Sequence, residues 1–244
     1  MTLTPDHDPM GQAIADYAAH GQARRPLMVT SYMFDDDEMP VATLFRTEAS
    51  MPRIELEALR RCRGHVLDVG AGAGCHTLAL EARGLQVTSI DISPLSTQVR
   101  TERGAHDARC ADFFADDFGR RFDTVLLLMN GLGMAGTLSG LPALLHRCRE
   151  LLAEGGRILA DSSDLRYVFE DDNGQLQWDD ADGYYGEVDY LMTYGTCRGE
   201  RFDWLYVDFP RLQAIAAACG MRAEMVAEGD HYDYLAEITA DGRS

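Results

Sequence analysis

The chain has 244 residues, a formal net charge of −18 and a hydrophobic content of 46%, which is enough to fill a core. Its length fits one α/β domain with an elaboration, or at most two small domains. A chain this acidic is repelled by phosphate backbones and by anionic lipid surfaces, and its arginine pairs are scattered. We therefore expect neither nucleic acid nor a membrane as a partner.

The six cysteines are dispersed and include no C-x-x-C pair, so we expect no metal site. The chain opens without the charged and apolar regions of a secretion signal, and no apolar run is long enough to span a bilayer. These features predict a cytoplasmic protein with reduced thiols. We interpret Cys75, which lies near a predicted helix start, as a small packed residue and not as a nucleophile.

The first 52 residues are predicted to form a helical, lid-like segment. Residues 10–19 have helical character, and residues 25–29 are extended. The acidic run 35–38 is interpreted as a solvated loop. A helix is predicted over residues 53–62, with Pro52 as a candidate N1 residue.

The rest of the chain is organised around the stretch Val66-Leu-Asp-Val-Gly-Ala-Gly-Ala-Gly-Cys75. Its apolar, β-prone start predicts a buried strand, its three glycines predict a tight loop, and the residues that follow favour a helix. Glycines let a backbone approach a ligand, and a helix N-terminus offers free N–H groups. The spacing G-x-G-x-G differs from the G-x-G-x-x-G of dinucleotide folds, in which a third glycine would stand in place of Cys75.

A second strand is predicted over residues 85–91, and it ends in an acid about twenty residues past the glycine loop. A carboxylate at the carboxyl end of this strand can accept both hydroxyls of a ribose, so Asp91 is a candidate ribose ligand. Ser93 as N-cap and Pro94 as first residue predict the start of the next helix. A short third strand is predicted over residues 106–110.

Strands and helices continue to alternate, which is typical of an α/β fold. Residues 121–129 predict a buried strand that is apolar on both faces, as expected of a central parallel strand. An amphipathic helix is predicted over residues 138–152, and a fifth strand over residues 157–161. Ligands of open α/β sheets bind at the carboxyl ends of the parallel strands, so we expect the site in the loops that follow these strands.

After residue 164 the pattern changes to alternating stretches that are rich in aromatic residues. Residues 186–194 and 201–207 have period-two alternation and predict an antiparallel pair. We interpret residues 165–207 as a cap inserted after the fifth strand. Its aromatic side chains either line a substrate pocket or pack on the sheet. The last predicted elements are a helix over residues 209–219 and strands over residues 221–227 and 232–238.

The motif Asp68-Val-Gly-Ala-Gly-Ala-Gly74 resembles motif I of the class I S-adenosylmethionine-dependent methyltransferases. This resemblance implies a Rossmann-like α/β fold with a seven-stranded, mostly parallel sheet and an antiparallel last strand, here with a small antiparallel β cap. It implies a methyltransferase domain over residues 53–244 that contains the cap. It also implies S-adenosyl-L-methionine as the cofactor and in-line transfer of its methyl group.

The resemblance also assigns roles to single residues. Asp112 would bind the adenine amino group, while Phe113 and Ile92 would pack on the adenine ring; the alternative for Asp112 and Phe113 is a surface aspartate and a core phenylalanine. Arg46 is a candidate partner of the cofactor carboxylate and Phe45 a cover for the sulfonium; the alternative is an exposed arginine beside a core phenylalanine. The predicted cofactor-binding residues are Asp68, Gly70, Ala71, Gly72, Gly74, Asp91, Ile92, Asp112, Phe113, Met129, Asn130 and Arg46.

The acceptor side is predicted to begin at Asn130-Gly-Leu-Gly133, which stands where the superfamily faces the transferable methyl group. Some amino-group methyltransferases carry D/N-P-P-Y there, and this chain lacks the prolines and the aromatic residue, so methylation of an amine is not implied. His231 is either a general base at neutral pH or a hydrogen-bonded turn histidine. The predicted catalytic residues are His231, Asn130, Glu187 and Tyr185, acting on a small-molecule substrate in a monomer or homodimer.

Further stretches are similar to a family of small bacterial methyltransferases, among them Asp161-Ser-Ser-Asp164 and Tyr184-Tyr-Gly-Glu187. This similarity covers most of the chain and implies no particular acceptor. A non-catalytic S-adenosylmethionine-binding regulator or partner subunit is an alternative, since it would keep the loop and the ribose acid. A nicotinamide-dependent oxidoreductase is disfavoured by the glycine spacing and by the strand pair after the last helix.

Overall fold

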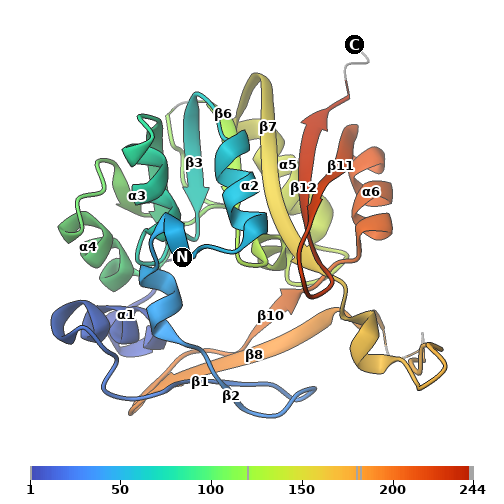
Figure 1. The fold of residues 1–244 in the computed structure, drawn as a ribbon, viewed down its shortest axis with the longest axis horizontal. Helices are drawn as coiled ribbons and strands as arrows, with labels where there is room; N and C mark the ends of the chain where they lie inside the picture. Colours follow the sequence, from blue (N-terminus) through green and yellow to red (C-terminus); the bar gives the residue numbers. More distant parts are fainter. Residues whose placement is uncertain (1, 120, 180, 182, 242–244) are drawn as a thin grey trace.

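The computed structural model describes residues 2–119, 121–179, 181 and 183–241. A large sheet with helices on both faces lies above a smaller sheet in the view of Figure 1. The strands of the large sheet are, in spatial order, β11 (Met221–Glu228), β12 (Asp233–Ala240), β7 (Leu152–Ser163), β6 (Phe122–Leu127), β3 (His65–Val69), β4 (Gln86–Asp91) and β5 (Ala108–Cys110).

The large sheet is parallel except at β12, which confirms the predicted fold class. The neighbouring pairs β3–β4, β3–β6, β4–β5 and β6–β7 are all parallel. Strand β12 runs antiparallel to both of its neighbours, β7 and β11. The carboxyl ends of the parallel strands therefore meet at one edge of the sheet, where the predicted site residues follow them.

Helices cover both faces of this sheet because its buried side chains alternate between two cores. Leu126 and Leu159 share a cluster with α2 (Arg53–Arg61) and α3 (Cys75–Ala82). Their neighbours Val125 and Ile158 share the opposite cluster with α5 (Leu141–Leu151) and α6 (Phe209–Ala218). Successive residues of a strand point to opposite faces, so a strand that is buried on both sides must be apolar throughout.

Two element boundaries differ from the prediction. Helix α2 begins at residue 53 as predicted, but Pro52 is its N-cap and not its N1 residue, and the helix ends one residue before the predicted position 62. Strand β7 begins at Leu152, directly after α5, whereas the sequence predicts a strand only from residue 157. Leu152 pairs with Phe122, and regular pairing resumes at Arg157 after an irregularity that includes Gly155, whose φ is +72°.

The smaller sheet combines two segments that are far apart in the chain. Its strands are, in order, β10 (Phe202–Leu205), β8 (Glu187–Tyr194), β1 (Leu27–Thr30) and β2 (Asp37–Glu38), and β9 (Cys197–Arg198) also pairs with β8. The antiparallel pairing of β8 with β10 confirms the predicted pair. Strand β1 pairs antiparallel with β8, with Leu27 opposite Tyr194. The N-terminal segment and the inserted segment thus share one sheet, and the division at residue 52 stays a prediction.

Helix α1 (Pro9–His20) connects this smaller sheet to the glycine loop. Asp8 caps the helix and accepts hydrogen bonds from the Gly11 N–H (2.8 Å) and from the hydroxyl of Ser93. Ser93 is itself the N-cap of α4 (Pro94–Glu102), as predicted. Ile14 of α1 shares a buried cluster with Ala73 of the glycine loop. The short 3-10 helices are η1 (Pro5–His7), η2 (Val41–Phe45), η3 (Glu48–Ser50), η4 (Gly131–Ala135) and η5 (Leu165–Phe169).

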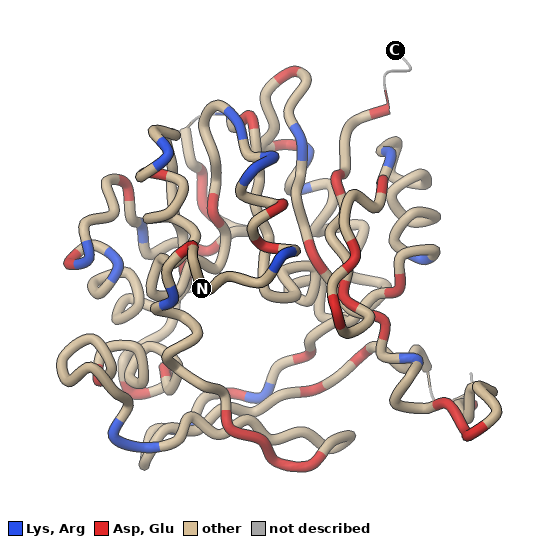
Figure 2. The backbone as a smooth tube through the Cα atoms, in the orientation of Figure 1, with Lys and Arg blue, Asp and Glu red and all other residues tan. Residues whose placement is uncertain are grey.

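Charge is distributed over both layers of the molecule. The chain has 40 acidic and 22 basic residues, and Figure 2 shows arginines interspersed among carboxylates on the large and the small sheet. No helix in the described ranges is long and apolar enough to cross a membrane. All six cysteines are free thiols.

Candidate cofactor and acceptor site

The glycine loop connects β3 to α3 at the carboxyl edge of the large sheet (Figure 1). Gly70, Gly72 and Gly74 have φ angles of +70°, +50° and +88°, a region that favours glycine. The Ala71 N–H donates to the carbonyl of Ile90 (3.0 Å), which ties the loop to β4. A Cβ at Gly70 would meet nothing within 4 Å, and a Cβ at Gly72 would meet one carbon at 4.0 Å. The loop therefore presents its backbone to open space, as a cradle for a ligand requires.

Asp91 lies at the end of β4, over the glycine loop. Its Oδ2 accepts the Gly72 N–H (2.8 Å), and its Oδ1 accepts the Ser93 N–H (2.8 Å). The carboxylate is thus fixed between the loop and the start of α4. Each of its oxygens keeps acceptor capacity, because an ionised carboxylate offers about four acceptor positions.

Asp68 supports the glycine loop from within β3. Its buried carboxylate accepts a hydrogen bond from the hydroxyl of Thr77 (2.6 Å), in the first turn of α3. Burial raises the pKa of the Asp68 carboxyl, and the charge of His76 works in the opposite direction. Asp68 therefore links strand and helix across the loop, and its direct contact with the cofactor stays a prediction.

Arg46 belongs to a buried network that joins the N-terminal segment to α2 and α3. Its Nε donates to Glu55 Oε2 (3.1 Å), and its second terminal nitrogen pairs with Glu55 Oε1. His76 Nε2 lies 2.8 Å from Glu55 Oε2, and all three side chains are 7% exposed. Burial opposes the charge on His76, but hydrogen bonds with Cys75 and Glu55 raise its pKa to about 10. Glu55 thus occupies the guanidinium that the sequence assigns to the cofactor carboxylate, and that assignment stays a prediction.

The residues predicted to hold the adenine differ in exposure. Ile92 is 42% exposed beside Asp91, as a residue that packs on a ligand would be. Asp112 Oδ1 accepts the N–H of Phe114 (2.9 Å). Phe113 is buried in the main core, whereas Phe114 is 47% exposed, and the two rings meet edge to face at 5.2 Å. The contact of Phe113 with adenine therefore stays a prediction, and Phe114 is a second aromatic residue at this position.

Asn130 connects the two sheets. Met129 and Asn130, in the loop after β6, have φ angles of +63° and +58°, which are uncommon for residues other than glycine and concentrate at functional sites. The Asn130 side chain donates to the carbonyl of Leu205 (3.1 Å) and accepts from the hydroxyl of Ser162 (2.8 Å). Ser162 belongs to β7 and Leu205 to β10, so the Asn130 amide joins the large sheet to the small one.

Asp161 holds the segment between β6 and η4, residues 128–130, which we call the Asn130 loop. The sequence did not reveal this role. The two carboxylate oxygens of Asp161 accept the N–H groups of Met129 and Gly131, each at 3.1 Å. Burial raises the pKa of Asp161 to about 7. The sequence feature that could have indicated this role is an acidic residue directly after the apolar residues 158–160 of a buried strand.

The cap packs closely on the residues that follow Asn130. A Cβ at Gly133 would lie 2.1 Å from Nε1 of Trp204 in β10, so glycine is required for this approach. On the same sheet, the hydroxyls of Tyr190 and Tyr206 form a hydrogen bond of 2.9 Å. Tyr206 directly follows Leu205, which binds Asn130. Cap aromatic residues therefore lie next to the Asn130 loop.

Two other predicted catalytic residues have structural partners. Glu187 Oε1 accepts the N–H of Leu138 (2.8 Å), which holds the cap against the loop before α5. The Tyr185 hydroxyl donates to Asp164 Oδ1 (2.8 Å), and its ring is buried. Within the described ranges no hydrogen bond links either residue to Asn130, and their catalytic roles stay predictions.

His231 lies in the turn before β12, close to the predicted edge. Asp233, the first residue of β12, pairs with Ser163 at the end of β7, so the turn reaches the carboxyl ends of the parallel strands. His231 is exposed. The next residue, Tyr232, stacks on Tyr167 of η5 with ring centroids 4.5 Å apart. The location agrees with the prediction, and the role of His231 as a base stays a prediction.

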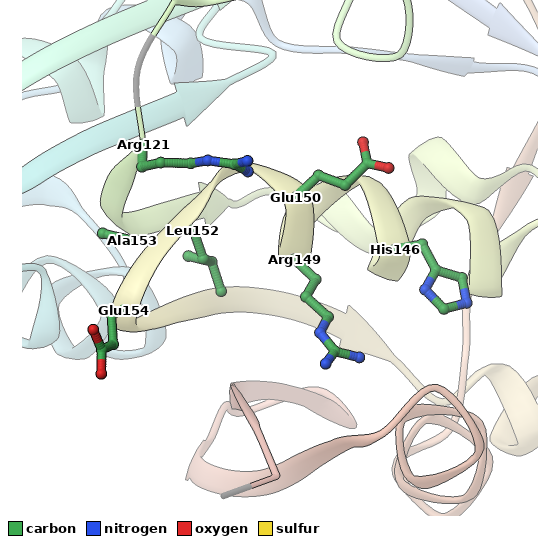
Figure 3. A pocket seen from close by; sticks show the side chains of 7 residues that line it. All are labelled: Arg121, His146, Arg149, Glu150, Leu152, Ala153 and Glu154. Carbon is green, nitrogen blue, oxygen red and sulfur yellow. The ribbon is translucent and has the colours of Figure 1, made fainter. Parts of the chain in front are cut away.

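A hollow of about 670 Å³ lies at the opposite edge of the large sheet (Figure 3). Arg121, Arg149 and Leu152 line it. These residues stand just before β6, near the end of α5 and at the start of β7. Ligands of such sheets bind at the carboxyl ends of the strands, so this hollow is remote from the candidate site.

Comparison with known proteins identifies relatives of this chain. The family model described as "Methyltransferase domain" matches residues 66–156. An S-adenosylmethionine-dependent methyltransferase from Bacteroides fragilis, crystallised with S-adenosyl-L-homocysteine, is 49% identical, covers 98% of both chains and superposes with a TM-score of 0.92. The CcbJ methyltransferase from Streptomyces caelestis is 14% identical, covers 95% of this chain and 98% of its own, and has a TM-score of 0.62, so it shares the fold.

A curated relative matches a smaller part of the chain. The release factor glutamine methyltransferase of Koribacter versatilis is 36% identical over 93 residues, which is 31% of this chain and 33% of that protein. The chain thus spans about a third of the length of this relative. The Bacteroides fragilis relative, by contrast, is similar over nearly the whole chain. Together with the glycine loop and Asp91, this similarity shows that the chain belongs to the class I S-adenosylmethionine-dependent methyltransferases.

Proposed function

We propose that the protein transfers the methyl group of S-adenosylmethionine to a small-molecule acceptor that binds beside the Asn130 loop, near the place where this loop contacts the smaller sheet. The observation that supports this proposal most is the geometry of Asn130. Its backbone is left-handed, and its side chain binds Ser162 of the large sheet and Leu205 of the cap. A residue that joins the cofactor domain to the cap stands where an acceptor must be aligned with the cofactor.

The cofactor side fits this function. When bound, S-adenosylmethionine supplies an activated methyl group on a sulfonium sulfur. Gly70 and Gly72 leave space for a ligand above the loop. The Asp91 carboxylate is fixed by the N–H groups of Gly72 and Ser93 and keeps acceptor capacity for the two ribose hydroxyls.

The acceptor side needs groups that orient a nucleophile, exclude water and, where necessary, remove a proton. The hydroxyls of Tyr190 and Tyr206 bind each other, and burial raises the pKa of the Tyr206 phenol, which therefore stays neutral and can orient an acceptor as a hydrogen-bond donor or acceptor. We assign proton removal, for acceptors that need it, to His231. Glu187 and Tyr185 hold the cap, through Leu138 and Asp164.

The test is production of S-adenosylhomocysteine by the purified protein in the presence of S-adenosylmethionine and a panel of acceptors. The panel contains small alcohols, amines, thiols and carboxylates, and a glutamine-containing peptide. We expect turnover with one class of small molecule. Replacement of Asn130 by Ala should lower that turnover roughly 10- to 100-fold, because the acceptor loses its alignment, and should change S-adenosylhomocysteine affinity far less.

Asn173→Ala is the matched control, because Asn173 is exposed in the loop between η5 and β8. Methylation of the peptide alone would contradict a small-molecule acceptor. Tight S-adenosylhomocysteine binding without turnover on any acceptor would favour a regulator or partner subunit. An unchanged rate in the Asn130 variant would contradict the role of Asn130.

A further inference from the structure

Two arginines, Arg100 of α4 and Arg103 directly after this helix, reach the back of the glycine loop. Arg100 donates from a terminal nitrogen to the carbonyl of Gly72 (2.7 Å). Arg103, which follows the last residue of α4, donates to the next carbonyl, that of Ala73 (2.5 Å). The two guanidinium groups therefore bind successive peptide groups of the loop that cradles the cofactor. Neither arginine belongs to the glycine motif or to the predicted site.

Arg100 is a buried cation whose hydrogen-bond partners belong to the loop and its surroundings. Its side chain is 0% exposed, and its Nε donates to the hydroxyl of Ser89 in β4 (2.8 Å). Among the residues that the structure describes, no carboxylate lies within ion-pair distance of Arg100. Burying a guanidinium is costly, and here hydrogen bonds to Ser89 and Gly72, together with the nearby charges of Asp91 and Asp68, offset that cost.

The peptide of Gly72 is held from both sides. Its N–H donates to Asp91, and its carbonyl accepts from Arg100. Asp91 is the predicted ribose ligand, so the residue that binds the cofactor and the residue that shapes the loop hold the same glycine. The fit is close: a Cβ at Gly74 would lie 2.7 Å from Cγ of Arg100. The loop and Arg100 are therefore matched in shape.

Arg103 connects the same loop to the N-terminal segment. Its guanidinium lies 4.8 Å from the ring centroid of Phe45, within cation–π distance. Phe45 in turn stacks on Tyr17 of α1, with centroids 4.4 Å apart. Phe45 is the predicted cover of the sulfonium. Arg103 thus fixes the position of this cover relative to the glycine loop.

We propose that Arg100 and Arg103 are positioning residues that hold the glycine loop in its cofactor-binding shape before the cofactor arrives. A loop that is already ordered loses less conformational entropy on binding, so the affinity for the cofactor is higher. Arg100 orders the loop together with Asp91. Arg103 orders the loop together with Phe45. Both arginines act through hydrogen bonds to backbone carbonyls of the loop.

The test is calorimetric titration of S-adenosylhomocysteine into four variants, at a temperature where the circular dichroism of each variant matches that of the wild type. We expect the dissociation constant to rise roughly 10- to 100-fold in Arg100→Met, less in Arg100→Lys, and about 3- to 10-fold in Arg103→Met. Arg149→Met is the control. Arg149 also donates to a backbone carbonyl, that of Cys219 (3.2 Å), at the opposite edge of the sheet. The affinity of Arg149→Met for S-adenosylhomocysteine should match that of the wild type.

A second readout separates loop order from general stability. Hydrogen exchange of the amides of residues 70–75 in the cofactor-free protein should accelerate in Arg100→Met and not in Arg149→Met, because only the first variant frees the loop. If Arg100→Met does not fold, Arg100→Lys and Arg103→Met decide the question. Wild-type affinity together with wild-type exchange in these variants would overturn the proposal. Neither readout needs an acceptor, so a failure here is distinct from a failure of the proposed methyl transfer.

Discussion

The cofactor side and the acceptor side of this protein are built in different ways. On the cofactor side, residues 65–91 supply a strand, a glycine loop, a helix and the Asp91 carboxylate within one short run, and Asp91 binds Gly72 directly. On the acceptor side, Asn130 meets Ser162 and Leu205, which come from distant parts of the chain. The cofactor side is therefore a local unit of the chain, whereas the proposed acceptor side depends on the docking of the cap. A substitution on the cofactor side should therefore weaken cofactor binding, and one on the acceptor side should lower methyl transfer without changing cofactor affinity.

The largest effect on the cofactor side should come from replacing Asp91. In Asp91→Ala, we expect S-adenosylhomocysteine binding to weaken by about 2–3 kcal/mol, because charged hydrogen bonds to the ribose and to the Gly72 N–H are lost together. Isothermal titration calorimetry measures this change. Glu102→Ala, which removes an exposed carboxylate of α4, is the control and should bind like the wild type. Wild-type affinity in Asp91→Ala would remove Asp91 from the cofactor site.

A substitution at the contact between η4 and the cap should impair methyl transfer and leave cofactor binding unchanged. In Gly133→Ala, the new Cβ collides with the indole of Trp204, so we expect a loss of about 1–3 kcal/mol in the free energy of unfolding. Methyl transfer should fall while S-adenosylhomocysteine affinity stays near that of the wild type. Denaturant titration and calorimetry measure the two quantities.

The double variant Gly133→Ala with Trp204→Ala tests the cause of that effect. Removing the indole restores the space, so the double variant should be no less stable than Trp204→Ala alone. If Gly133→Ala instead lowers cofactor affinity as strongly as Asp91→Ala, the two sides are not separable in the way proposed here.

A smaller effect should appear in the pH dependence of stability. The pKa of His76 is raised to about 10 in the folded chain, above its usual value near 6.5. The contribution of His76 is therefore complete below about pH 6.5 and is lost as the pH rises through 10. We expect the free energy of unfolding to fall by roughly 2–3 kcal/mol between pH 7 and pH 9.

The variant His76→Gln should flatten this slope, because it removes the titrating group that binds Glu55. His146→Gln, at an exposed position, should leave the slope unchanged. Denaturant titrations across the pH range measure both variants. If the slope persisted in His76→Gln, a group other than His76 would be its cause, and this account of the pH dependence would be wrong.

Much of the large sheet was predictable because its signals are local. Glycines at the loop and Ser93 as N-cap each act within a few residues of their own position, and Asp91 accepts the N–H of Ser93, two residues further on. The apolar run at the end of β6, from Val125 to Leu127, follows from burial on both faces, which the structure shows in its two core clusters. The family resemblance added the seven-stranded, mostly parallel sheet with its antiparallel last strand, and the identity of the cofactor.

The remaining features depend on contacts that no local pattern contains. The pairing of β1 with β8 joins strands that are far apart in the sequence, and no residue pattern in either strand identifies the other as its partner. The sequence also assigned Arg46 to the cofactor without its buried partner Glu55, which is nine residues away. Asp161 and Arg100 were missed because each looks like an ordinary polar residue until the loop that it holds is in place. Acceptor chemistry falls in this second group, since three separate segments meet at Asn130.

The division between the two sides is tested most directly by a crystal structure of the protein with S-adenosylhomocysteine. We expect the ribose hydroxyls to lie on Asp91, above the loop of Gly70 and Gly72, and the sulfur to face the Asn130 loop and the tyrosines of the cap. A ribose that does not contact Asp91, or a sulfur that faces away from Asn130, would contradict this assignment of the two sides.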